Sequence, residues 1–115
     1  MSSTSITKFL PTGIKTQEVH WNHGILRLTQ DAELHVSEDR GVLYFFVYEP
    51  ELDQEFLLAE IEFDVNRSDM SEDQYVLLFW ILNEYDEGVD IKSARQLEDT
   101  FKKLVGELRK IGLIK

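Results

Sequence analysis

The sequence contains no cysteine, which excludes disulfide bonds, thiolate metal sites and cysteine nucleophiles. Its longest apolar run covers residues 75–82, far fewer than the ~20 residues needed to cross a bilayer. The first residues lack the basic patch and apolar stretch of a secretory signal, so we expect a cytoplasmic protein. Glycine-rich phosphate loops, His-Glu-x-x-His pairs and nucleophile elbows are missing as well. We therefore predict that the protein is not an enzyme.

Positive charge is almost missing from the middle of the chain. No lysine occurs between Lys15 and Lys92, and residues 31–90 contain eighteen Asp or Glu but only two basic residues, Arg40 and Arg67. This segment has a formal charge of −16, whereas the whole chain has −10. Charge sorted in this way selects partners by sign. It predicts a basic partner, and it disfavours direct binding to nucleic acid or to an anionic membrane.

The length of 115 residues is typical of one domain, and the apolar fraction of 43% is sufficient for a hydrophobic core. Residues 1–8 are rich in Ser and Thr and are predicted to form a disordered tail. We assign residues 9–115 to a single α+β domain.

From about residue 9 to residue 66, apolar and polar residues alternate with the period of half-buried strands. The pattern is clearest over 25–36, with a bend expected near Gln30, and over 57–65, where Leu57 is predicted to point inward and Leu58 outward. Residues 42–48 are apolar on both faces and predict a central strand, and residues 14–21 predict a weaker first one. Short turns between these segments predict an antiparallel meander of four to five strands.

Two helices are expected after the strands, because the period changes and two capping boxes appear. Ser71 with Gln74 predicts the start of a helix over about 71–87, and Ser93 with Gln96 the start of another over about 93–111. The second helix has one apolar stripe, whereas residues 75–82 are apolar on nearly every side. The predicted fold is a two-layer α+β domain.

Carboxylates alternate along the last predicted strand, where Glu60, Glu62 and Asp64 should project on one side about 6.8 Å apart. Two neighbouring rows of this kind would approach the density of a DNA strand, which has one phosphate per ~3.4 Å of axis. The residues predicted to bind a partner are acidic, with one tyrosine beside them: Asp31, Glu33, Glu49, Glu51, Asp53, Glu60, Glu62, Asp64, Asp69 and Tyr48.

The leading functional hypothesis is a non-catalytic acidic protein that binds a basic surface of a partner, in the manner of a DNA-mimic inhibitor of a nucleic-acid-binding protein. One alternative is an immunity protein or antitoxin that neutralises a basic enzyme. The other is a structural or assembly subunit that uses the apolar helix, with Val76, Leu77 and Trp80 as its dimer contact. The sequence leaves open whether the protein is a monomer or a homodimer.

Metal and cofactor sites are not predicted. His20, His23 and His35 have no diagnostic spacing, and His35 lies on the outward side of its predicted strand. Residues 64–75 begin like an EF-hand loop, but Asp69 stands where the required glycine would be.

Overall fold

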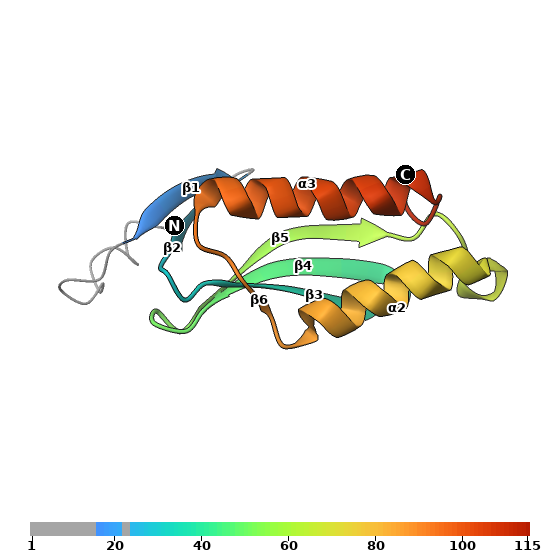
Figure 1. Ribbon diagram of the computed structural model, residues 1–115, viewed down its shortest axis with the longest axis horizontal. Coiled ribbons are helices and arrows are strands. Elements are labelled where there is room, and N and C mark those ends of the chain that lie inside the picture. Colours follow the sequence, from blue (N-terminus) through green and yellow to red (C-terminus); the bar gives the residue numbers. More distant parts are fainter. Residues whose placement is uncertain (1–15, 22–23) are drawn as a thin grey trace.

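The computed structural model of the protein describes residues 16–21 and 24–115. Its elements in chain order are the strands β1 (Gln17–Trp21), β2 (Gly24–Leu28), β3 (Glu33–Asp39), β4 (Val42–Glu49) and β5 (Gln54–Glu62), the short 3₁₀ helix η1 (Arg67–Asp69), helix α2 (Glu72–Asp86), strand β6 (Val89–Asp90) and helix α3 (Ala94–Lys110) (Figure 1). The predicted α+β class, with strands before helices, is confirmed. The tail predicted at residues 1–8 and the first residues of the strand predicted over 14–21 lie outside the described residues.

The strands form two antiparallel sheets. β1 and β2 make a hairpin, and the second sheet has the order β5-β4-β3-β6. The prediction of one strand over 25–36 was wrong: where a bend was expected near Gln30, a complete turn separates β2 from β3 and places them in different sheets. The meander was predicted to have four to five strands, but it has only three, β3-β4-β5, because β1 and β2 form a separate sheet. The short β6 pairs with the beginning of β3. No helix of the described residues combines the length and the apolar character that a bilayer crossing requires.

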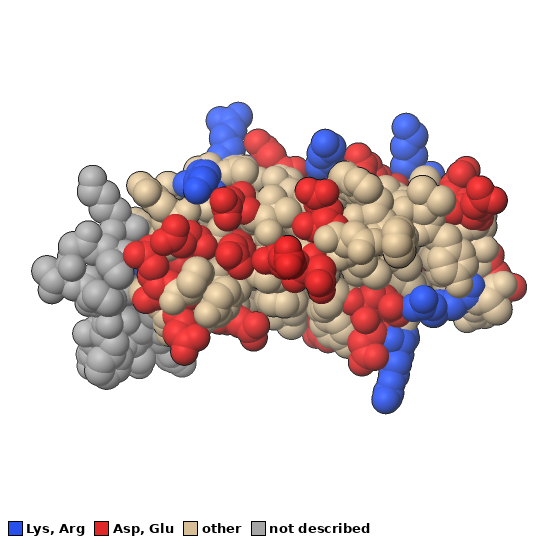
Figure 2. All heavy atoms as spheres, turned by 60° about the horizontal axis from the view of Figure 1, so that its bottom comes forward, with Lys and Arg blue, Asp and Glu red and all other residues tan. Residues whose placement is uncertain are grey.

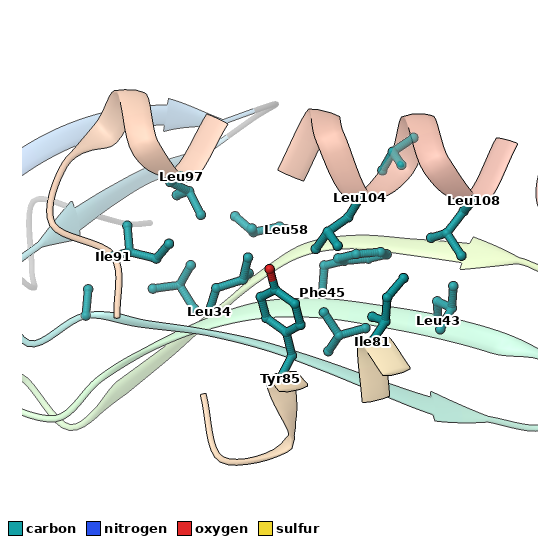
Figure 3. Close-up of a cluster of buried hydrophobic side chains, with 14 of the residues drawn as sticks. Leu34, Leu43, Phe45, Leu58, Ile81, Tyr85, Ile91, Leu97, Leu104 and Leu108 are labelled. Atoms are coloured by element: carbon teal, nitrogen blue, oxygen red, sulfur yellow. The ribbon is translucent and has the colours of Figure 1, made fainter. Parts of the chain in front are cut away.

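Both helices pack on the same face of the four-stranded sheet (Figure 1). Figure 3 shows buried side chains of the sheet meeting those of both helices, among them Leu34, Leu43, Phe45, Ile81, Tyr85, Leu104 and Leu108. The ring of Phe45 also meets Phe101 of α3 edge-on, with centroids 5.2 Å apart. The opposite face of the sheet is covered by no helix of the described residues.

Each helix begins at the serine that the sequence indicated. The Ser71 hydroxyl accepts from the N–H of Gln74 at 3.2 Å, and the Gln74 side chain accepts from the N–H of Ser71 at 2.9 Å, which completes a capping box. At α3 the Ser93 hydroxyl accepts from Gln96 N–H at 3.1 Å. The Gln96 side chain accepts instead from the N–H of Lys92, so the second cap differs from a standard box.

A β-bulge in β5 changes the side on which its residues point. Phe45 pairs with Ala59 and the next residue, Phe46, pairs with Leu57, so Leu58 is an extra residue. Leu58 is 2% exposed and Leu57 is 49% exposed. The prediction that Leu57 points inward and Leu58 outward was wrong, because it assumed unbroken alternation through an all-apolar stretch.

Candidate partner-binding surfaces

The open face of the sheet carries a row of aromatic side chains along β4. Residues alternate between the two faces of a strand, so Tyr44, Phe46 and Tyr48 point away from the buried Phe45. We call these three residues the aromatic ridge. They are half-buried because side chains on β3 and β5 flank them.

Carboxylates border the ridge on the β5 side. Tyr44 pairs with Glu60 and Tyr48 with Glu55, and Glu62 pairs with Val42 further along. We call Glu55, Glu60 and Glu62 the β5 carboxylates; all three are exposed. Among the described residues, none of the ion pairs involves a β5 carboxylate. No direct ion pair therefore offsets their charge within the described part of the chain.

His35 fixes the ridge on the β3 side. Its ring stacks on Phe46 with centroids 5.1 Å apart and meets Tyr48 edge-on. Its Nε2 lies 3.1 Å from Glu33 Oε1, and its Nδ1 lies 3.2 Å from the carbonyl oxygen of Asp86. Both neighbours are oxygen atoms that can accept a hydrogen bond from a ring N–H. These contacts hold His35 against the ridge and join β3 to the end of α2.

The structure gathers several predicted residues at one end of the sheet. The turn over residues 50–53 and the turn before β3 lie together, because Glu33 pairs with Tyr48. This end carries exposed or half-buried carboxylates from two turns and three strands: Asp31, Glu33, Glu51, Asp53, Glu55 and Asp90. Lys92, whose Nζ lies 3.8 Å from Asp90 Oδ2, brings one positive charge to the group.

Of the other three residues predicted to bind a partner, two lie elsewhere and the third, Glu49, lies at this end but is buried. Asp64 follows the end of β5, and its carboxylate lies 4.0 Å from Lys115 Nζ at the C-terminus of the chain. Asp69 belongs to η1. Glu49 was predicted to lie on the acidic surface but is only 1% exposed, so its carboxylate cannot reach a partner in this structure.

Glu49 instead connects two turns. Its carboxylate accepts hydrogen bonds from the N–H of Thr29 and, at 2.6 Å, from the Thr29 hydroxyl. Burial raises the pKa of the Glu49 carboxyl above its ordinary value, although the hydrogen bonds from Thr29 act in the opposite direction. The Thr29 hydroxyl also accepts from the N–H of Asp31 at 3.1 Å. Glu49 therefore holds the β2–β3 turn against the end of β4.

Helix α2 provides a second, apolar surface. Val76 and Trp80, predicted as a dimer contact, are exposed, whereas their predicted companion Leu77 packs partly against the core. The most exposed large apolar side chain of the described residues is that of Phe79, at 70%. The sequence analysis missed it because Phe79 follows Leu78 in a segment that is apolar on both sides.

The two histidines of the described residues, His20 and His35, do not lie together. His20 lies on β1 and His35 on β3, in different sheets, and His23 lies outside the described residues. Within residues 16–21 and 24–115, no group of three or more His, Asp or Glu has the arrangement of a metal site.

Comparison of the chain with protein-family models, with curated proteins and with solved structures finds no match.

Proposed function

We propose that this chain is a non-catalytic interaction protein that binds a basic surface of a partner protein through the open face of its four-stranded sheet. The observation that carries the proposal is the aromatic ridge bordered by the β5 carboxylates, which have no ion-pair partner among the described residues. Ordinary sheet faces mix positive and negative side chains, because like charges on neighbouring strands repel.

Lysine and arginine side chains fit this combination of groups. Aromatic faces attract their cations with about 0.5–2 kcal/mol each, and carboxylates accept paired hydrogen bonds from arginine. Tyr44 and Tyr48 lie directly opposite Glu60 and Glu55. A basic side chain lying between such a pair would contact a ring and a carboxylate at once.

A nucleic-acid-binding protein is the class of partner that we favour, because its Lys and Arg side chains are arranged to meet a polyanion. The protein would then act as an inhibitor that occupies the nucleic-acid surface. Glu60 and Glu62, two residues apart on β5, should lie about 6.8 Å apart, which is coarser than the ~3.4 Å per phosphate of a DNA strand. In this proposal the aromatic ridge supplies additional contacts to the partner, which compensate for the wider spacing of the carboxylates relative to the phosphates of DNA. Neutralisation of a basic enzyme, as by an immunity protein, would use the same contacts.

The test is capture of partners from a nuclease-treated lysate of the host, eluted with rising salt and identified by mass spectrometry. Glu55→Lys, Glu60→Lys and Glu62→Lys are combined in one variant. A control variant combines Glu98→Lys, Asp99→Lys and Glu107→Lys on α3, which packs on the other face of the sheet. Both variants change the net charge equally.

We expect the wild type and the α3 variant to retain basic proteins that salt releases as the Debye length falls below ~8 Å. The β5 variant should lose them while its thermal unfolding shows an intact fold. Equal retention by the β5 variant would contradict the proposal. Equal loss from both variants would show that net charge alone, and no particular face, determines binding.

A further inference from the structure

Helix α2 displays four large apolar side chains to solvent, namely Tyr75, Val76, Phe79 and Trp80. We call this group the α2 patch. Val76, Phe79 and Trp80 are 60%, 70% and 51% exposed. Their spacing places them together on the helix side opposite the buried Leu78 and Ile81. Only one other large apolar residue of the described chain, Leu57, is exposed.

The patch is held in a fixed shape. A complete capping box starts α2, and Leu78, Ile81 and Tyr85 anchor the helix in the core. The Asn83 side chain donates to the carbonyl of Phe79 at 2.8 Å on the exposed side. A partner would therefore meet a preformed surface and would not have to order it.

The size of the patch indicates the centre of an interface. An aromatic side chain offers ~200 Å² in full, so the exposed fractions give a patch of roughly 400 Å². This lies within the range of functional patches on monomers, but a standard interface uses about 800 Å² per partner. The remaining area must come from the residues around the patch.

Acidic residues predominate around both ends of the helix, although Arg67, which pairs with Glu38, lies beside Tyr75 at the N-terminal end. Glu72 and Asp73 lie before it, and Glu84, Asp86 and Glu87 lie after it. Helix α2 itself contains no Lys or Arg. Figure 2, in which the side with α2 and β6 comes forward, shows many acidic side chains, with the basic ones mainly at its margins.

The three acidic residues at the C-terminal end of α2 do not stabilise the helix. The carbonyl end of a helix is negative, so carboxylates at this end destabilise it, and no basic residue lies in the last turn of α2 to offset them. If α2 of a second copy packed on the patch, an acidic end of one helix would lie beside an acidic end of the other, whether the two helices ran parallel or antiparallel. Such like-charge contacts oppose self-association through the patch.

We infer that the α2 patch binds a basic amphipathic segment of a partner protein, in which apolar side chains cover the patch and flanking Lys or Arg meet the acidic ends of α2. An amphipathic helix has this pattern and binds an apolar surface through residues about one turn apart. The inference concerns a surface other than the open sheet face, and it does not depend on the proposed function.

The test uses calorimetric titration with a synthetic 18-residue peptide of Leu and Lys, with Leu at the spacing of one helix face. A matched peptide carries Glu in place of each Lys. Phe79→Ser combined with Trp80→Ser removes the centre of the patch, and Leu57→Ser is the control on the sheet. Glu84→Lys with Glu87→Lys removes the acid at the end of α2. The β5 variant described above serves as a further control.

We expect the Leu/Lys peptide to bind at least tenfold more weakly to the Phe79/Trp80 and Glu84/Glu87 variants, and with unchanged affinity to the Leu57 variant. The β5 variant should bind the peptide within threefold of wild type, so this inference and the proposed function can fail separately. The Glu84/Glu87 variant should unfold at a higher temperature than wild type, which excludes misfolding as the cause of its weaker binding.

Three outcomes would overturn the inference. One is equal binding of the peptide to the Phe79/Trp80 variant, and another is equal binding of the Leu/Glu peptide. The third is a micromolar dimer of the wild type in sedimentation that the Phe79/Trp80 variant lacks, because a second copy would then cover the patch.

Discussion

Gly88 joins α2 to β6 at a position where a side chain has no room. Its φ is +94°, and an added Cβ would lie 2.6 Å from His35 Nε2 and 2.8 Å from Glu33 Oε1. Gly88→Ala should therefore destabilise the fold in two ways: through its backbone conformation and through displacement of the His35 ring from its contacts.

The size of the effect follows from these two terms. A left-handed backbone costs a residue with a Cβ roughly 1–2 kcal/mol. Moving the ring breaks hydrogen bonds to Glu33 and Asp86, which contribute about 1 kcal/mol between them when partly exposed. We expect a total loss of roughly 2–3 kcal/mol, which for a chain of this length lowers Tm by about 8–12 °C.

Thermal and urea unfolding at pH 7, followed by circular dichroism, measure this change. Gly106→Ala is the matched control, because Gly106 lies inside α3 and an added Cβ would meet nothing within 4 Å. That variant should gain about 0.5–1 kcal/mol. In a His35→Ala background, Gly88→Ala should cost less, since the ring is gone. A Gly88→Ala protein as stable as wild type would refute the described path of this loop, whereas a destabilised Gly106→Ala protein would contradict the open surroundings of Gly106 in α3.

Two further predictions concern buried hydrogen bonds. Burial raises the pKa of the Glu49 carboxyl, so the folded state binds its proton more tightly than the unfolded state, and this residue's contribution to stability falls as the pH rises from 4.5 through the folded value. Glu49→Gln should remove that contribution. In urea unfolding, the free energy of unfolding of this variant should fall less between pH 5 and pH 8 than that of wild type. Identical pH profiles of the two proteins would contradict the prediction. The indole of Trp21 donates to the Leu58 carbonyl at 2.9 Å. Trp21→Phe should lose about 1 kcal/mol in urea unfolding, and no loss would show that this bond does not hold the bulge.

The helices could be located from the sequence because their signals are local. Ser71 with Gln74 marked the start of α2, and Ser93 with Gln96 the start of α3. The predicted ranges, 71–87 and 93–111, each include the cap residue at either end of the observed helix. A capping residue contacts groups within four positions, so a short stretch of sequence contains the whole signal.

The strands were less predictable because their details depend on distant residues. Residues 56–59 are all apolar, so nothing in them marks the bulge at Leu58, which receives a hydrogen bond from Trp21. Glu49 is one carboxylate in an acidic segment, and only its pairing with Thr29, twenty positions earlier, explains its burial. The hypothesis of a basic partner followed from composition alone. The strand registers and ion pairs of the structure were needed to place Glu55 beside the aromatic ridge and to show that Asp64 lies near Lys115 instead.

The position of β5 at the end of the sheet has a consequence for the protein alone in solution. An outermost strand has backbone donors and acceptors that another molecule's strand can pair with, which is how many proteins begin to aggregate. The bulge interrupts the regular backbone of β5, and Trp21 occupies its Leu58 carbonyl. Glu55, Glu60 and Glu62 add repulsion along the same strand in any second copy that approaches. The carboxylates on β5 thus oppose strand pairing between two copies of the free protein. They do not oppose the approach of a basic partner.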